Sequence, residues 1–306
     1  MISLSALSRL RDPGDVQGAD GGPGSPAVIR PVLTRRRQVG TASARSLLLT
    51  VLGEFVLPHA APVWTSTLVT VLGRLGVEEK SARQALARTA AEGWLDSARE
   101  GRRVRWSLSP PGRRLLTEGA ERIYSFSAAL SGWGRVWLLL LVSVPETQRA
   151  LRHRLRTRLT WAGFGSPAPG LWISPHPDRE VECEAVLREL GLGATAMSFR
   201  ACFGGIGEQS ALVAQAWDVD EIGALYQRFI DAFGGLTPAP GDPVLLAQTR
   251  LVHEWRRFPF LDPRLPEELL PSPWLGTRAA ALFQSRHADW AEGARRRWRE
   301  LAAAAD

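Results

Sequence analysis

Residues 78–105 read EEKSARQALARTAAEGWLDSAREGRRVR, and this stretch decides the fold of the N-terminal part of the chain. Its first half predicts a helix over about residues 78–92, because small apolar residues recur at helical spacing and Gly93 provides an end. Its second half predicts two strands, over 94–98 and 102–108, joined by a tight turn. A helix followed by such a hairpin is typical of a winged helix-turn-helix.

The outward face of this helix carries side chains that suit the edges of DNA bases. These side chains are Lys80, Arg83, Gln84 and Arg88. Arginine pairs bidentately with guanine and glutamine with adenine, so we expect this face to contact bases. Glu78 and Glu79 lie in the first turn, where the helix dipole favours acids, and are expected to point away from the centre of the basic face. A solvated basic helix is the alternative for this element taken alone.

The predicted hairpin concentrates positive charge around its turn. Its four arginines are Arg99, Arg102, Arg103 and Arg105. A basic hairpin directly after a candidate recognition helix matches a wing that lies against DNA phosphates. Order, length and charge together favour DNA binding over a merely solvated surface.

The elements around this stretch complete the expected N-terminal domain. A helix is predicted over 44–56, and Pro58 stops it. A second helix is predicted over 65–75, with Thr65 or Ser66 as its cap. A short final helix is expected to open at Pro110 and Pro111.

The remaining pattern predicts an α+β multidomain chain. Strands over 135–144, 170–174 and 195–203 alternate with helices over 146–161 and 178–190, which indicates a ferredoxin-like α+β domain with its helices on one sheet face. Residues 211–306 are mainly helical between proline-rich turns. We therefore expect a disordered arm (1–40), a winged-helix domain (41–125), a middle domain for dimerisation or scaffolding (130–208) and a helical C-terminal domain (209–306).

Composition narrows the class of protein. The 306 residues carry a net charge of +7, almost entirely as arginine, which makes a polyanionic partner plausible. The longest apolar run, 136–142, is too short to span a bilayer, and no signal peptide is evident. Cys183 and Cys202 lack zinc-site spacing and are expected to be reduced and buried. We expect a cytoplasmic protein without metal, cofactor or catalytic machinery.

Two further clusters each have two interpretations. The helix over 146–161 carries five arginines and a histidine, and is either a solvated face or a surface for phosphates, those of DNA among them. The cluster His253, Trp255, Arg256 and Arg257 is either an effector site or a structural cluster whose arginines form ion pairs within the fold. In the second case, Asp262 and Glu267 would pair with the arginines and fix the loop over 259–271.

Longer motifs resemble the PaaX family of phenylacetate-catabolism repressors. The matching segments are Arg45-Ser-Leu-Leu-Leu-Thr-Val-Leu-Gly-Glu-Phe, Val77 through Trp94-Leu95, Trp161-Ala-Gly-Phe-Gly, Pro169-Gly-Leu-Trp-Ile-Ser-Pro175 and His253-Glu-Trp-Arg-Arg-Phe-Pro-Phe-Leu-Asp-Pro-Arg-Leu-Pro-Glu-Glu-Leu-Leu-Pro271, then Trp274 and Gly276. They cover nearly all of residues 40–300 in the family's domain order. The resemblance is strongest in the segment that begins at His253.

The resemblance implies a GntR-like winged helix, a middle domain similar to a small CRISPR-associated endoribonuclease, and a helical C-terminal domain. It also implies a homodimer that represses catabolic genes on a pseudo-palindromic operator and releases DNA when it binds an aryl-coenzyme A thioester such as phenylacetyl-coenzyme A. The effector response would then belong to the C-terminal domain (209–306), and the phosphates of coenzyme A are a second candidate for the basic helix over 146–161. Two alternatives stay open. One is a metal-dependent nuclease in the middle domain, for which Glu146 and Asp178 are the nearby acids without obvious partners. The other is a regulator that responds to no small molecule.

Overall fold

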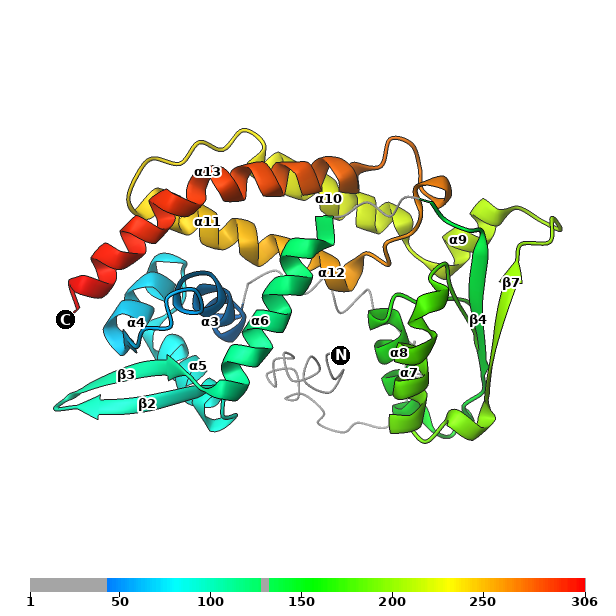
Figure 1. The fold of residues 1–306 in the computed structure, drawn as a ribbon, viewed down its shortest axis with the longest axis horizontal. Coiled ribbons are helices and arrows are strands. Elements are labelled where there is room, and N and C mark those ends of the chain that lie inside the picture. The colour runs from blue at the N-terminus through cyan, green and yellow to red at the C-terminus, as the bar shows by residue number, and fades with distance from the viewer. Residues whose placement is uncertain (1–42, 128–131, 306) are drawn as a thin grey trace, which may run out of the picture. The chain divides into compact units, whose positions relative to one another are not determined.

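The computed structural model describes residues 43–127 and 132–305 and has an α+β architecture with two small antiparallel sheets (Figure 1). The predicted arm over 1–40 lies outside the described residues. Contacts divide the chain into two compact units. Unit 1 joins the residues up to Tyr124 with Thr237–His253 and the segment from Arg286 onward, and unit 2 comprises Ser125–Leu236 and Glu254–Ser285. The C-terminal third of the sequence thus contributes residues to both units.

Unit 1 begins with four helices and a three-stranded sheet. The helices are α3 (Ala44–Val51), α4 (Thr65–Arg74), α5 (Glu79–Ala91) and α6 (Pro110–Tyr124). The strands are β1 (Val63–Trp64), β2 (Leu95–Glu100) and β3 (Arg103–Leu108), in the order β1-β3-β2. A two-residue turn joins β2 to β3, and Gly101 takes a φ of 61° there, which explains glycine at this position.

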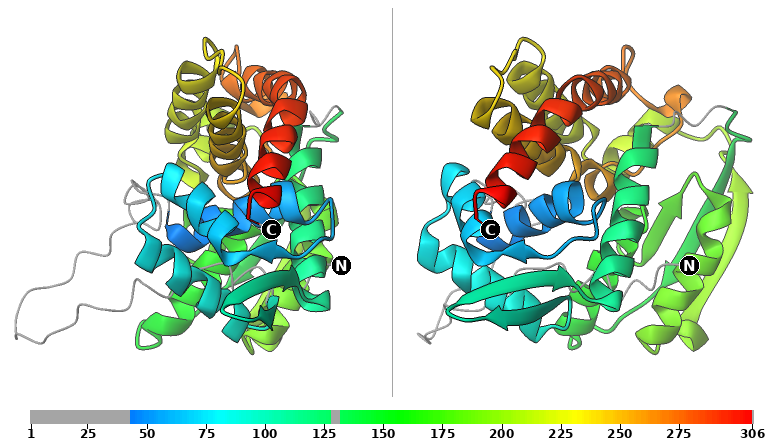
Figure 2. Two further views of the ribbon diagram at one scale, coloured as in Figure 1. Left: turned by 90° about the vertical axis from the view of Figure 1, so that its left-hand side faces the viewer. Right: turned by 60° about the vertical axis from the view of Figure 1, so that its left-hand side comes forward.

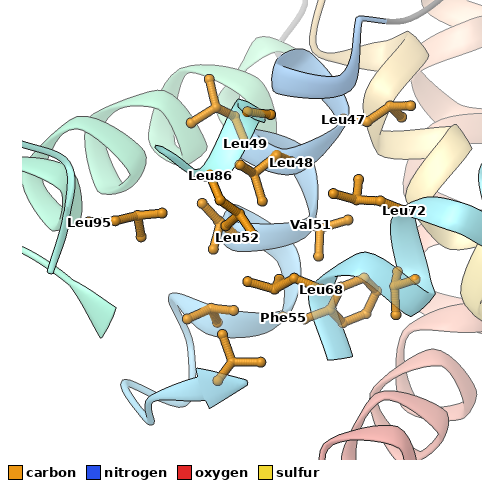
Figure 3. Packing of buried hydrophobic residues seen from close by; sticks show 14 of the residues in the cluster. Leu47, Leu48, Leu49, Val51, Leu52, Phe55, Leu68, Leu72, Leu86 and Leu95 are labelled. Carbon is orange, nitrogen blue, oxygen red and sulfur yellow. The ribbon is translucent and has the colours of Figure 1, made fainter. Parts of the chain in front are cut away.

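One apolar cluster holds unit 1 together (Figure 3). Leu48, Val51 and Leu52 follow the helical spacing of the first helix and are buried against leucines from α4 and α5. The C-terminal helices α11 (Asp242–Trp255) and α13 (Leu275–Ala303) add residues to the same cluster. The ring of Trp298 stacks on Phe55 with centroids 5.2 Å apart, and the last turns of α13 (red) lie against the first helix (blue) in both views of Figure 2.

Four details of unit 1 differ from the sequence-based expectations. The first helix widens after Val51 into a π-helical turn, η2 (Leu52–Val56), which periodicity alone does not reveal. Strand β1 was not predicted, and α6 runs for 15 residues instead of being short. The prediction that Thr65 or Ser66 caps α4 was wrong: Trp64 is the N-cap residue, and no side chain caps the helix.

Unit 2 contains a four-stranded antiparallel sheet in the order β5-β6-β4-β7. Its strands are β4 (Val136–Val142), β5 (Gly165–Ala168), β6 (Leu171–Ser174) and β7 (Ala196–Cys202). Helices α7 (Arg149–Trp161) and α8 (Glu180–Glu189) lie on one face of the sheet (Figure 1). Strand β5 was missed, because its sequence Gly-Ser-Pro-Ala has little strand propensity.

The other face of this sheet is covered only in part. Trp137 is buried with Val213 and Trp217 at the end where α9 (Gln209–Ala216) packs. Farther along the strands, Leu141 pairs with Met197, and Leu139 pairs with Phe199. Leu141, Met197 and Phe199 are 39%, 58% and 48% exposed. The sheet therefore presents an apolar patch, which we call the β4–β7 patch (Leu141, Met197 and Phe199).

The rest of the chain is helical, as expected. It adds α10 (Val219–Phe233), α12 (Phe258–Leu261) and the short 3-10 helices η3 (Ser125–Ser127), η4 (Pro177–Arg179), η5 (Gly193–Thr195) and η6 (Glu267–Leu269). Across residues 43–127 and 132–305, no helix is both long and apolar enough to cross a membrane.

Candidate nucleic-acid interface

Helix α5 has the two faces that the sequence indicated. Ala82, Ala85, Leu86 and Thr89 are buried. Lys80, Arg83, Gln84 and Arg88 are exposed. The buried face is made mainly of small side chains, which allows a helix to approach its neighbours closely, and α5 packs on both α3 and α4. The exposed face is free to enter a groove.

One acid lies closer to this exposed face than expected. Glu79 was predicted to point away from the basic centre, but its Oε1 accepts a hydrogen bond from Arg83 Nε at 2.8 Å. The two residues are four apart, so they are neighbours on the helix surface. Both side chains are more than half exposed, and such pairs contribute little to stability. To contact a base, Arg83 must therefore break its pair with Glu79 and form hydrogen bonds with the base edge instead.

The C-terminal end of α5 is fixed by a buried arginine from α3. Arg45 forms an ion pair with Glu92, and its guanidinium lies 5.0 Å from the centroid of the Trp94 ring. Gly93, with a φ of 77°, lets the chain turn between these two partners. The orientation of α5 is thus set by the unit's core and by this anchor together.

The arginine hairpin (β2, β3 and their turn) is supported by an aromatic ring. The guanidinium carbons of Arg103 and Arg105 lie 3.8 and 4.2 Å from the centroid of Trp64. Trp64 is only 5% exposed, so this cation–π arrangement holds both arginines against strand β1. Sequence reasoning missed Trp64; the signal was a tryptophan immediately before a predicted helix.

Thr65 links the same hairpin to the start of α4 by two hydrogen bonds. Its hydroxyl donates to the carbonyl of Val104 at 3.0 Å and accepts from Trp106 Nε1 at 2.8 Å. This use of the hydroxyl explains why Thr65 does not cap α4. The hairpin is therefore tied to the start of α4 by side chains as well as by the β1–β3 ladder.

The four hairpin arginines are not equivalent. Arg105 also pairs with Glu100 at 3.3 Å and is half-buried, whereas Arg99 donates to the carbonyl of Gly101 at 3.1 Å. Arg102 is exposed at the turn and has no bonded partner within the described chain. Arg102 is thus the hairpin arginine most available to an external phosphate.

The cluster over 253–257 does not form one site. His253 is buried, and its Nδ1 lies 3.0 Å from the hydroxyl of Thr50 in α3. Trp255 is 0% exposed and stacks on Phe283, with centroids 4.7 Å apart. Trp255 is therefore part of an aromatic core and presents no free face for ligand stacking.

The arginines and acids of this cluster have other partners than the structural interpretation predicts. Arg257 pairs with Glu254 at 2.9 Å, and burial lowers the pKa of Arg256 to about 10. Asp262 instead accepts hydrogen bonds from the Tyr226 hydroxyl and the Arg264 backbone N–H, both at 2.6 Å. Burial raises the pKa of Asp262 despite these bonds. The proline-rich loop is thus fixed in part by a tyrosine and by its own backbone. The predicted pairing of Arg257 with Asp262 or Glu267 was wrong, because Arg257 pairs with Glu254.

Sequence reasoning missed a buried polar cluster around Glu54. Its carboxylate accepts from the Tyr124 hydroxyl at 2.5 Å and from Gln248 Nε2 at 2.7 Å, and it lies 3.1 Å from His287 Nε2. These groups come from η2, α6, α11 and α13, all within unit 1. A lone acid in the apolar run Leu-Leu-Leu-Thr-Val-Leu-Gly-Glu-Phe-Val-Leu was the available signal. We call these four residues the Glu54 cluster.

The Glu54 cluster keeps its carboxyl group ionised. Burial alone would raise the pKa of Glu54. The hydrogen bond and charge of His287 lower it, as do the hydrogen bonds from Tyr124 and Gln248, and these three partners together outweigh the effect of burial. The net effect is a pKa of Glu54 below its ordinary value. The opposite shift occurs at Tyr124, where burial and the Glu54 charge raise the pKa of the hydroxyl.

Within residues 43–127 and 132–305, no group of three or more histidine, cysteine or acidic residues is arranged to hold a metal ion. The two cysteines are free; Cys183 is buried, but Cys202 is exposed, so the expectation of two buried thiols was half wrong. Cys202 lies on the edge strand β7, which explains its exposure.

Comparison with known proteins gives successive matches along the chain. A PaaX-like protein model matches residues 43–112, the PaaX protein central Cas2-like domain matches 130–213, and the PaaX-like protein C-terminal domain matches 217–300. The transcriptional repressor PaaX of Escherichia coli is 33% identical over an alignment of 251 residues, and the match covers 78% of this chain and 78% of that protein.

A solved structure has a related fold. An uncharacterized protein from Mycobacterium tuberculosis superposes with a TM-score of 0.58 at 23% identity, covering 85% of this chain and 99% of that one. This likeness concerns the fold alone. The three successive matches and the identity to the repressor lead to one conclusion: the chain belongs to the PaaX family.

Proposed function

We propose that this protein is a dimeric, DNA-binding transcriptional repressor whose residues 43–124 form a winged helix-turn-helix. The observation that carries the proposal is the exposed face of α5, which presents Lys80, Arg83, Gln84 and Arg88 beside a hairpin rich in arginine. In this assignment α4 and α5 form the helix-turn-helix, and the arginine hairpin is the wing. The related repressor of Escherichia coli supports it.

The two parts of this surface have different roles in the proposal. Arg83, Gln84 and Arg88 contact base edges in the major groove, with Lys80 at the start of the helix. Arg99, Arg102, Arg103 and Arg105 bind phosphates, and Trp64 holds two of them in place. A mobility-shift series with duplexes selected from a random pool tests the proposal. Preference for a selected duplex over a scrambled one supports it, and equal binding to both contradicts it.

We assign the middle domain a ferredoxin-like topology and a role in dimerisation. The strand order β5-β6-β4-β7 with two helices on one face supports the topology. The β4–β7 patch and the open edge of β7 support a second copy of the chain as partner, because exposed apolar patches mark interaction surfaces. A dimer also fits an operator with two half-sites.

The dimer proposal is tested by replacing two apolar residues of the β4–β7 patch with aspartate. Met197→Asp with Phe199→Asp should turn a dimer into a monomer in light scattering after size exclusion. Ile206→Asp is the control, since Ile206 is 96% exposed but lies outside the sheet. A dimer that survives the double change would exclude the patch as the interface.

We further propose that an aryl-coenzyme A thioester, such as phenylacetyl-coenzyme A, releases the protein from DNA. The family resemblance of the segment over 253–271 supports this ligand, with Arg256 and Arg257 as the candidate contacts that remain half-buried. Contacts of Trp298 with Phe55 give a route from the C-terminal helices to the first helix of the DNA-binding part. His253 and Trp255 would act by supporting this segment.

A ligand screen tests the effector. Phenylacetyl-coenzyme A should raise the thermal midpoint and weaken DNA binding, because a ligand that binds only the folded state stabilises it by mass action. Coenzyme A without the aryl group is the control. An unchanged midpoint and unchanged DNA affinity at saturating thioester would favour a regulator without a small-molecule ligand.

A further inference from the structure

Helix α7 of the middle domain carries charge that the fold does not use. Its sequence RALRHRLRTRLTW contains five arginines and one histidine but no acidic residue. Arg152 and Arg156, and likewise Arg154 and Arg158, are four residues apart, and like charges at this spacing destabilise a helix. The first turn holds no acid, although the helix dipole would favour one there. Stability of the helix therefore does not explain this sequence.

Neighbouring acids neutralise only one of these arginines. Arg158 pairs with Glu189 of α8 at 2.8 Å. The other paired acids of α8 are engaged elsewhere: Glu184 binds Arg188 and Glu180 binds Arg200. Arg149, Arg154 and Arg156 are exposed and form no ion pair with any residue that the structure describes. An unbalanced positive surface remains.

Three of the exposed side chains form a line. Arg149, His153 and Arg156 follow the i, i+4, i+7 spacing, and we call them the α7 ridge. Leu155 and Leu159 bury a different side of the helix. From Arg149 to Arg156 the ridge extends about 10 Å, at a rise of about 1.5 Å per residue.

We propose that the α7 ridge is a second contact surface for the phosphate backbone of duplex DNA. Charges spread over about 10 Å along the outside of a helix match a line of phosphates, whose charges repeat every few ångströms along each strand. A small anionic ligand would instead require donors that converge in a concave site. In this proposal the ridge contacts phosphates and no base edge, so it adds affinity without sequence preference. This inference rests on the proposal that the protein binds DNA.

The test is the salt dependence of DNA affinity. Arg149→Gln with Arg156→Gln should reduce the magnitude of the slope of log K against log salt by about 2, since each phosphate contact contributes about 0.9. The reduction should be the same on a selected duplex and on a scrambled one. The thermal midpoint should stay the same or rise, because a like-charge pair on the helix is removed.

A matched control removes the same charge from the same unit. Arg228→Gln with Arg278→Gln alters two exposed arginines of α10 and α13 and should leave the slope unchanged. A wild-type slope in the α7 variant, or an equal loss in the control, overturns the inference. If the wild-type protein binds no duplex at all, the proposed function fails as well. Binding with an unaffected slope refutes the α7 ridge alone.

Discussion

Helices α5 and α7 are both basic and exposed, yet they present different chemistry. The outward face of α5 mixes cations with the amide of Gln84, and Glu79 already pairs with one of those cations. The outward face of α7 has only arginine and histidine, with no acid anywhere in the helix. Glutamine pairs bidentately with adenine and arginine with guanine, whereas phosphate contacts are the same at every base pair. Positive charge alone therefore does not decide between the two kinds of contact, and the amide among the cations of α5 is what favours base readout there.

The two helices also differ in how firmly neighbouring residues hold them in place. Helix α5 is anchored by Arg45 and stands next to a hairpin that Trp64 supports. Helix α7 has a single ion pair to α8, and the hairpin that follows it, β5–β6, contains no arginine. Base readout requires side chains held in a fixed position, and phosphate attraction tolerates mobile ones. The following changes separate these roles.

The largest effect is expected from the support of the hairpin. Trp64→Ala removes a buried ring and should lower the free energy of unfolding by about 3–5 kcal/mol. It should also weaken DNA binding, because Arg103 and Arg105 lose their platform. Denaturant titration measures the first effect. Trp64→Phe keeps a ring and should recover most DNA affinity; affinity lost equally in both variants would argue against a positioning role.

The next effect concerns the Glu54 cluster, which has no counterpart near α7 in the residues described. Glu54→Gln should cost about 1.5–3 kcal/mol of unfolding free energy at pH 7, the range for hydrogen bonds to charged groups. The pKa of Glu54 is lowered in the folded state, so its stabilising contribution is complete above the ordinary carboxyl pKa and is lost as the pH falls through the folded value. The difference between the two proteins should therefore shrink on acidification. A difference that stays constant from pH 7 to about pH 3 would contradict this account.

A smaller effect is expected from a single base contact. Arg83→Ala should reduce discrimination between a selected and a scrambled duplex by about 1–3 kcal/mol, the usual value of a bidentate contact. Arg83 loses only an exposed pair with Glu79, so the fold should be unaffected. Mobility shifts on both duplexes measure the change. Equal losses on the two duplexes would remove Arg83 from base readout.

The smallest effect is expected from Arg102 at the hairpin turn. Arg102→Ala should weaken binding to all duplexes and lower the magnitude of the salt slope by about 1. The same change should leave discrimination intact, which distinguishes it from Arg83→Ala. A loss confined to the selected duplex would assign Arg102 to base contacts.

Much of this organisation was predictable from local pattern. Apolar spacing predicted both faces of α5, and the order of charged turn residues predicted the hairpin. Contacts between distant segments were not predictable. Trp64 lies 39 and 41 positions from Arg103 and Arg105, but Glu54 meets residues 194 and 233 positions away. Only the tertiary fold brings such partners together.

Selection from a random duplex pool tests the central claim most directly. Wild-type protein and the Arg149→Gln, Arg156→Gln variant should enrich the same two-fold symmetric sequence, since α7 adds affinity without reading bases. A variant with Arg83→Ala and Gln84→Ala should lose that enrichment while still binding DNA at low salt. Enrichment of the wild-type sequence by the α5 variant, or of no sequence by the wild-type protein, would contradict the assignment of α5 as the recognition helix.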